Sequence, residues 1–322
     1  MDVAIVWNGK AGSAADLDAE DVKARVQRAM SRDVTIVDAG KDPRAAAREA
    51  IAAGARIVIA AGGDGTVSAC ATEVIGKNVE LGVLPVGTSN SFSAALEISS
   101  ELDEAIANLG RTDRRVIDAA VASNGQEERV MILHCMIGLH AETIEETPAE
   151  AKRRWGAIAY AVTGLKKLAT VSPFAVEMQT AEHRVRCKAI AVAVANLAPV
   201  KSVLAHGPSH LLADDGRMDV TIVAADSIAE AIATGVHLYR SAQNHEAASR
   251  DNVGSFSTPR VEITTDTPQS VLVDGEPFGD TPVTIEALPR ALTVIAPPPA
   301  VAEGDVIDAP LLGLPDLEVT AR

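Results

Sequence analysis

Two glycine-rich stretches in the first third of the chain combine residue types that bind phosphate groups. Gly62-Gly63-Asp64-Gly65-Thr66 directly follows the apolar run 57–61, and Gly87-Thr88-Ser89-Asn90-Ser91 begins one residue after the run 81–85. Glycines let backbone N–H groups approach phosphate oxygens, and the N-terminus of a following helix adds a favourable partial charge. Asp64 is no phosphate ligand, so its position indicates a magnesium-water shell or a proton acceptor. Each stretch by itself also fits an ordinary turn that caps a helix.

Two acidic turns in the second half of the chain offer further carboxylates. Asp214-Asp215-Gly216 precedes the apolar run 218–223, and Asp274-Gly275-Glu276 follows the apolar run 271–273. Asp-Gly beside a strand is typical of a simple turn, and both stretches fit that interpretation. Asp274 and Glu276, however, flank a glycine, and such a pair can bind a cation or activate a hydroxyl as a general base.

A basic segment stands out against the acidic background of the chain. Residues 152–167 contain no acidic side chain, although the formal net charge of the whole chain is -15. The basic residues are Lys152, Arg153, Arg154, Lys166 and Lys167, and Trp155 and Tyr160 lie between them. A basic amphipathic helix with such aromatics can lie on an anionic membrane surface, and a core helix with charged ends fits equally well.

Composition excludes several classes of protein. The chain has 322 residues, 47% of them hydrophobic, which is enough for two packed domains and excludes general disorder. Its 29 basic residues against 44 acidic ones, with two Trp, two Tyr and four Phe, exclude a general nucleic-acid-binding surface. Three cysteines and seven histidines without ligand spacing predict neither a disulfide framework nor a zinc site. The start of the chain has no basic region before a short apolar run, so we expect an intracellular protein without a membrane span.

The spacing of apolar residues predicts how the first two motifs are positioned. Up to about residue 112, short apolar runs alternate with helical patterns, which favours an open α/β domain with a parallel sheet. Ligands of such sheets bind at the carboxyl ends of the strands, where both glycine-rich stretches fall. The expected strands are 3–7, 34–37, 56–61 and 81–85, and the expected helices are 17–30, 43–53 and one from about 67.

After residue 112, consecutive apolar runs joined by turns predict a mostly antiparallel, sandwich-like β domain. The runs 116–122 and 129–137 flank the turn 123–125 and predict a hairpin, and helices are expected only near 152–170 and 226–243. The other expected strands are 174–180, 186–195, 218–223, 260–265, 269–273, 283–286 and 292–295. We therefore expect an α/β domain over 1–112, a β-rich domain over 113–299 whose last strand returns to the first domain, and an acidic tail over 300–322.

The order and spacing of these motifs, from Asn8 to about Pro298, resemble the diacylglycerol kinase catalytic-domain family of bacterial lipid kinases, which includes sphingosine and ceramide kinases. The resemblance implies a nucleotide domain followed by a β-sandwich-like lipid-substrate domain. It also implies phosphoryl transfer from ATP with Mg²⁺ to a primary hydroxyl of a diacylglycerol- or ceramide-type lipid. The expected location is the cytoplasm, in peripheral contact with the inner face of the membrane, and a second copy of the chain remains open as a partner.

Individual roles follow from the same resemblance. It implies that Asp64 organises catalytic magnesium and that Glu276, in the catalytic stretch with Asp274, accepts the hydroxyl proton. It implies that Asp215 binds a structural magnesium together with the backbone carbonyls of Leu212 and Arg217. The residues that it implies in binding ATP are Asn8, Gly12, Gly62, Gly63, Gly65, Thr66, Thr88 and Asn90.

Two alternatives remain beside the lipid kinase. An NAD kinase shares Gly-Gly-Asp-Gly, but the Asp-Gly-Glu and Asp-Asp-Gly motifs of the second half resemble the lipid branch. A nucleotide-binding regulator without turnover is the other alternative. The chain departs from the family pattern at Gly9, where many relatives have proline, and at Ala69 and Ser91, where many have acids. The departures at Ala69 and Ser91 are the support for a regulator.

Overall fold

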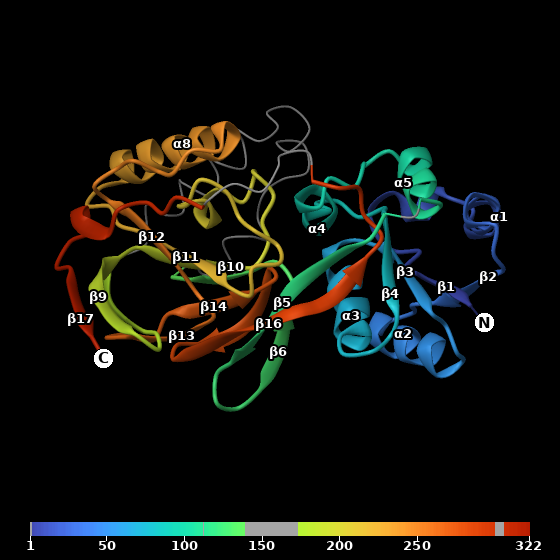
Figure 1. The fold of residues 1–322 in the computed structure, drawn as a ribbon, viewed down its shortest axis with the longest axis horizontal. Coiled ribbons are helices and arrows are strands. Elements are labelled where there is room, and N and C mark those ends of the chain that lie inside the picture. Colours follow the sequence, from blue (N-terminus) through green and yellow to red (C-terminus); the bar gives the residue numbers. More distant parts are fainter. Residues whose placement is uncertain (1, 112, 139–172, 300–305) are drawn as a thin grey trace. The chain divides into compact units, whose positions relative to one another are not determined.

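Residues 2–111, 113–138, 173–299 and 306–322 are described by a computed structural model of the chain. The basic segment 152–167 and the helix expected near 152–170 lie outside these residues. The chain divides into two compact units (Figure 1). Unit 1 comprises Met1–Ala119 and Pro289–Glu303, and unit 2 comprises Ala120–Leu288 and Gly304–Arg322.

Unit 1 is an α/β domain around a parallel sheet. The strands lie in the order β16-β4-β3-β1-β2, and each neighbouring pair is parallel. The central strands are apolar throughout and buried at every residue, as expected for a parallel sheet covered on both faces. The strands are β1 (Val3–Trp7), β2 (Val34–Asp38), β3 (Ile57–Gly62), β4 (Glu80–Pro85) and the last part of β16 (Val283–Val294).

Helices cover both faces of this sheet, α1 and α5 on one side and α2 and α3 on the other (Figure 1). Asp42 caps α2 by accepting a hydrogen bond from the Ala45 N–H, and Pro43 is the first helical residue, which confirms the predicted start. The elements are η1 (Gly12–Asp16), α1 (Ala19–Met30), α2 (Pro43–Ala52), α3 (Asp64–Val74), α4 (Ser91–Ala95) and α5 (Leu102–Leu109).

An ion cluster joins α2 to α3 in unit 1. The Glu73 side chain is only 8% exposed, and its carboxylate accepts hydrogen bonds from Arg44 and Arg48. Lys77 lies 3.5 Å from the same carboxylate. The hydrogen bond from Arg48 is the main cause that lowers the pKa of Glu73 to about 2.

Unit 2 is a β domain of two mostly antiparallel sheets. One sheet has the order β12-β11-β10-β7-β14-β15, and the other continues along β17-β9-β8-β13-β16, with the β5–β6 hairpin beside β16. The remaining strands are β5 (Arg115–Ser123), β6 (Glu128–Met131), β7 (His134–Ile137), β8 (Phe174–Gln179), β9 (His183–Ala189), β10 (Ala191–Ala195), β11 (Met218–Val223), β12 (Val253–Thr258), β13 (Arg260–Thr265), β14 (Ser270–Val273), β15 (Glu276–Asp280) and β17 (Glu318–Ala321). Helical elements are η2 (Val203–Ala205), α8 (Ile228–Asn244) and η3 (Leu311–Gly313). These architectures confirm the predicted fold class.

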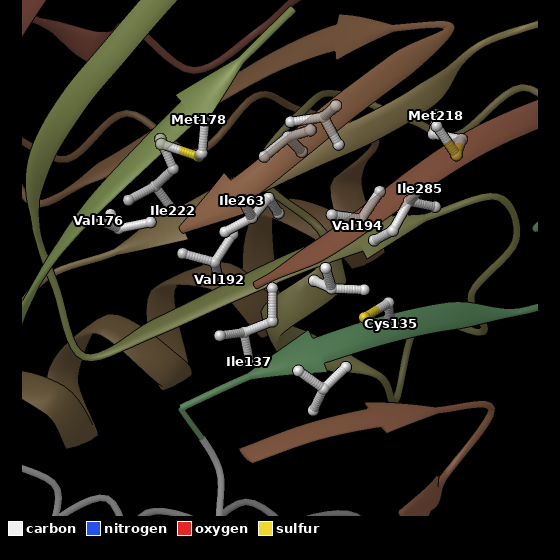
Figure 2. Close-up of a cluster of buried hydrophobic side chains, with 14 of the residues drawn as sticks. Cys135, Ile137, Val176, Met178, Val192, Val194, Met218, Ile222, Ile263 and Ile285 are labelled. Carbon is white, nitrogen blue, oxygen red and sulfur yellow. The ribbon is translucent and has the colours of Figure 1, made fainter. Parts of the chain in front are cut away.

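The core of unit 2 is built from alternate residues of both sheets. Val176 and Met178 of β8 and Ile263 of β13 meet Val192 and Ile222 of the other sheet (Figure 2). This alternation follows from the two-residue period of β-strands, whose successive side chains point to opposite faces. The apolar pattern therefore determines which residues of each strand form the core.

The predicted single strand over 129–137 is wrong. Two strands, β6 and β7, occupy this region, and they belong to different sheets. The break falls at Ile132 and Leu133, whose backbone N–H groups are bound by the carboxylate of Asp274. An apolar run is continuous across such a break because both halves are buried, so apolar content alone does not reveal it.

Residues 306–322, which the sequence analysis assigns to an acidic tail, are part of unit 2 and pack on its strands. The Ser255 N–H donates to the Ala309 carbonyl at 3.0 Å, and the Lys188 N–H donates to the Pro315 carbonyl at 2.8 Å. β17 then pairs antiparallel with β9, so that Val319 lies opposite Val185. Among the described residues, no helix is both long and apolar enough to span a bilayer.

Candidate active site

Three loops at the carboxyl ends of β1, β3 and β4 come together in unit 1, and they require glycine where they meet. Gly12 has φ 39°, and a Cβ atom on it would lie 2.5 Å from the Val86 carbonyl oxygen. A Cβ atom on Gly87 would lie 2.2 Å from the Cα atom of Gly63. Because these backbones are in contact, the two glycine-rich stretches form one continuous surface.

Asn8 and Thr66 join the first and second of these loops. The Asn8 Nδ2 donates to Thr66 Oγ1 at 3.0 Å, and Asn8 Oδ1 accepts from the Lys10 N–H at 3.2 Å. Thr66 is only 4% exposed, and it packs so closely on Gly62 that a Cβ atom there would lie 2.3 Å from Thr66 Oγ1. Both side chains therefore hold the loops in position, and the exposed Gly65 backbone lies at the surface beside them.

Asn90 holds the second glycine-rich loop closed. Its backbone has φ 49°, in the left-handed region that asparagine tolerates. Its Oδ1 accepts from the Gly87 N–H at 3.0 Å, and its Nδ2 donates to the carbonyls of Pro85 at 3.1 Å and Gly87 at 3.0 Å. The side chain is thus engaged with its own loop, and Thr88 lies exposed at the loop surface.

Asp64 lies where two helices begin. The structure starts α3 at Asp64, three residues before the predicted start at about Val67, so the predicted start is wrong. Its Oδ1 accepts a hydrogen bond from the Phe92 N–H of α4 at 3.0 Å. Two helix N-termini, with their partial positive charge, therefore lie beside the Asp64 carboxylate and the glycine loops. Phe92 was missed by the sequence analysis because it contributes a backbone N–H, which has no signature in the sequence.

In unit 2, Asp274 and Gly275 form the two-residue turn between β14 and β15. Their φ angles are 51° and 87°, as a tight hairpin requires. The Asp274 carboxylate accepts hydrogen bonds from the N–H groups of Ile132 at 3.0 Å, Leu133 at 2.9 Å and His134 at 3.2 Å. Asp274 therefore positions the backbone, whereas Glu276 is exposed at the first position of β15.

The predicted metal residues Leu212, Asp215 and Arg217 lie in the loop before β11 of unit 2. β10 and β7 separate β11 from β14 in the sheet, so these residues and the Asp274 turn belong to different strands. The Asp215 Oδ1 accepts from the Arg217 N–H at 2.9 Å. One carboxylate and two carbonyls are the oxygen donors that magnesium prefers, although no cluster of three or more His, Cys, Asp or Glu suited to a metal occurs in the described part of the chain.

Asp219, which the sequence analysis missed, is a buried carboxyl group near this loop. It is 5% exposed, and its Oδ1 has no hydrogen-bond partner among the described residues. Burial is the main cause that raises the pKa of Asp219 to about 8, and the neighbouring Asp215 and Asp308 contribute to the same shift. An orphaned carboxyl oxygen beside Asp215 fits a cation nearby. The sequence signal that could have revealed Asp219 is the presence of an acidic residue inside the apolar strand 218–223.

Comparison with known proteins assigns both units. The family model described as diacylglycerol kinase catalytic domain matches residues 2–122. The model described as YegS C-terminal NAD kinase beta sandwich-like domain matches residues 135–296, half of the chain. The chain belongs to the diacylglycerol kinase catalytic-domain family. It is therefore a kinase of the lipid kinase family, with the order of domains that this family has.

Relatives of this family span most of the chain. A "Probable lipid kinase YegS-like" of Stenotrophomonas maltophilia is 29% identical over 77% of this chain and 81% of its own length. One of Xanthomonas oryzae is 27% identical over 96% and 97%. An uncharacterized protein of Synechocystis is 31% identical over 76% of this chain, which spans 55% of that protein. The crystal structure of a diacylglycerol kinase from Bacillus anthracis shares the fold, with TM-score 0.69, 21% identity and coverage of 92% and 97%.

Proposed function

We propose that the protein is an ATP-dependent kinase that phosphorylates a primary hydroxyl of a diacylglycerol- or ceramide/sphingoid-type lipid at a membrane surface. The observation that carries the proposal is the contact between the Gly63 and Gly87 backbones beside Asp64. A surface made of backbone N–H groups and helix N-termini suits phosphate groups. Membership in the lipid kinase family supports an alcohol of a lipid as the acceptor.

Phosphoryl transfer requires mainly positioning and neutralisation of charge by the protein. The acceptor oxygen bonds to the γ-phosphorus of ATP, the bond from that phosphorus to the ADP oxygen breaks, and the hydroxyl proton moves to the Glu276 carboxylate. The glycine loops hold the phosphates, and the hydrogen bonds of Asn8, Thr66 and Asn90 hold those loops in position. Asp274 holds the turn that presents Glu276.

Magnesium is the cation that fits the carboxylates of Asp64 and Asp215, and it would neutralise charge on the phosphates of ATP. Asp64 would hold it at the glycine loops. Asp215 and the carbonyls of Leu212 and Arg217 would hold a second, structural ion, and the orphaned Oδ1 of Asp219 supports a cation in that neighbourhood. We further propose a cytoplasmic location with peripheral contact to the inner face of the membrane, where the lipid substrate lies.

The test is incubation of the full chain with labelled ATP, Mg²⁺ and mixed micelles, each containing one lipid. Diacylglycerol, ceramide and sphingosine are compared, with NAD as a soluble acceptor, and products are separated by chromatography. We expect a labelled phospholipid from at least one lipid and no labelled NADP. Labelled phosphate on NAD alone would assign the protein to the NAD kinases. ATP binding without any labelled acceptor would assign it to the regulators.

A further inference from the structure

Unit 2 has a groove at the edge of its sandwich, lined by residues of β9 and β17 on one side and of β12 on the other. Its volume is about 360 Å³, within the range of ~300–1,000 Å³ that is usual for small-molecule sites. The residues that line it come from these three strands, the turns beside them and the segment 306–322. Because Leu311 and Val319 are among them, that C-terminal segment completes the groove.

The floor of the groove is apolar. Val185 and Val319 are opposite each other in the β9–β17 pairing, and Phe256 and Leu311 pack on the core of unit 2. The segment also leaves large apolar side chains at the surface. Leu312 is 91% exposed and Val319 is 50% exposed, among the few such residues in the described part of the chain. Of these two residues, Val319 lines the groove, and an exposed apolar side chain in a groove suits an apolar partner.

The remaining wall is polar and carries a fixed cation. The Arg217 guanidinium donates from Nε to Ser257 Oγ at 3.0 Å and also donates to the Ser257 carbonyl, so its position is set. His183 and Glu182 also line the groove, and the His183 Nδ1 lies 4.0 Å from the Glu182 carboxylate. A guanidinium is weakly hydrated and binds carboxylates through paired hydrogen bonds. The groove thus combines an apolar floor with one site for an anionic group.

The groove is remote from the proposed proton acceptor. β12 and β15 form the two opposite edges of the six-stranded sheet, and Glu276 lies on β15. Five strand spacings of ~4.8 Å separate these edges, which is about 24 Å along the sheet. The lining contains no residue of β14 or β15. A lipid in this groove therefore does not present its hydroxyl to Glu276.

We propose that the groove is an accessory site for one long-chain fatty acid. The hydrocarbon chain lies over Val185, Phe256 and Val319, and the carboxylate pairs with Arg217. Charge complementarity at one end and an apolar floor along the rest favour a single-chain anionic amphiphile over a neutral two-chain lipid. The site contains neither Asp64 nor Glu276 and shares only Arg217, through its backbone carbonyl, with the proposed structural ion. It depends on the C-terminal segment beyond the residues that the family models match.

The test uses palmitate, below the concentration at which it forms micelles, titrated calorimetrically into the full-length protein. Val319→Asp places a charge on the groove floor, and Thr320→Asp places the same charge on the next residue of β17, which does not line the groove. We expect one palmitate per chain, about tenfold weaker binding to the Val319→Asp protein, and unchanged binding to the Thr320→Asp protein. Lipid phosphorylation is measured on the same samples.

A spin label at the end of the palmitate chain locates the site independently of these variants. Broadening of the methyl signals of Val185, Val319 and Leu311 supports the proposal, and broadening confined to other residues overturns it. Equal binding by all three proteins, or equal loss in both variants, also overturns it. Sedimentation as a dimer that only Val319→Asp dissociates, without palmitate binding, would show that a second copy fills the groove. Palmitate binding by a protein that phosphorylates no lipid would contradict the proposed function and leave this site standing.

Discussion

The candidate loops of the two units use their polar side chains for the same purpose and leave different groups available for chemistry. In unit 1, Asn8, Thr66 and Asn90 bind other parts of the loops, so the groups that remain available are the glycine backbone, the exposed Thr88 and the Asp64 carboxylate. In unit 2, Asp274 binds three backbone N–H groups, and the carboxylate that remains exposed is that of Glu276. Unit 1 therefore holds a ligand largely by shape, with Asp64 as its charged side chain, whereas the Asp274 turn of unit 2 presents the charged side chain of Glu276.

The largest effect on lipid phosphorylation is expected at Asp64, which positions α4 through a hydrogen bond and also carries a charged group. Asp64→Ala removes the hydrogen bond to the Phe92 N–H and the negative charge, and we expect lipid phosphorylation to fall below detection in a folded protein. Asp64→Asn can keep that hydrogen bond without the charge. If the asparagine variant retains near-normal turnover, Asp64 only positions α4, and unit 1 contributes no charged group to the reaction.

Glu276→Gln tests the claim that unit 2 contributes a charge. The change preserves the size of the side chain and removes the proton acceptor, so kcat should fall by about 10²–10⁴-fold while ATP affinity changes little. Initial rates and equilibrium ATP binding are measured separately. Collapse of ATP affinity with kcat preserved would instead make Glu276 a ligand of the nucleotide or of its ion.

Gly87→Ala tests the claim that unit 1 acts by shape. The added methyl group would lie 2.2 Å from the Gly63 Cα atom, so the two loops must separate, and we expect a loss of about 10²-fold in kcat/KM. Gly65→Ala is the matched variant, because its Cβ atom meets nothing within 4 Å. Thermal unfolding should therefore be altered only by Gly87→Ala. A loss of activity in the Gly65→Ala protein, without a change in stability, would then indicate that ATP lies close to the Gly65 backbone.

Two buried carboxyl groups, Asp219 in unit 2 and Glu73 in unit 1, differ in the same way. Asp219 has a pKa of about 8 in the folded protein against 3.8 as its ordinary value, because burial and two other carboxylates disfavour its charge. Folding stability is therefore lost as pH rises from about 4 to 8. Asp219→Asn should raise the free energy of unfolding at pH 8 by about 1–3 kcal/mol and change it little at pH 4, measured with EDTA present. An equal effect at both pH values would contradict the raised pKa.

Glu73 in unit 1 should show the opposite dependence on pH, with a smaller effect. Its pKa is lowered to about 2 from 4.5, so its contribution to stability is present above pH 4.5 and is lost as pH falls toward 2. Arg44 and Arg48 are more than half exposed, and solvent screening limits the contribution to about 1 kcal/mol. Urea unfolding of Glu73→Gln at pH 3 and pH 6 measures it. A variant that is equally destabilised at both values would show a packing role instead.

Local patterns were sufficient to predict most elements of unit 1. The Asp42-Pro43 start of α2 and the buried strands β1, β3 and β4 are encoded within a few neighbouring residues each. The convergence of the glycine loops also follows, because the carboxyl ends of parallel strands meet at one edge of the sheet. The predicted start of α3 was late because Asp64 and Gly65 look like turn residues when the helix that they open is not considered.

The order of strands in unit 2 could not be predicted in the same way. Neighbouring strands such as β7 and β14 are far apart in sequence, and no local signal encodes their pairing. The hydrogen bonds from residues 132–134 to Asp274 join parts of the chain that are about as far apart in sequence. A stretch that looks like a simple acidic turn in the sequence therefore fixes the position of a distant segment. Residues 306–322 show too little periodicity for a strand to be predicted. β17 forms because its backbone hydrogen-bonds to β9 at the edge of the sheet.

By itself, the sequence determined the two fold classes, the family and the residue types at the candidate site. Those properties depend on periodicity, turn chemistry and motif spacing, all of which act over short stretches of chain. Only the tertiary structure decided which polar groups are already engaged and which remain available. The hydrogen bonds of Asn8, Asn90 and Asp274, the orphaned oxygen of Asp219 and the groove completed by Val319 all depend on burial and on partners brought close by folding, and such proximity is not encoded at any single position.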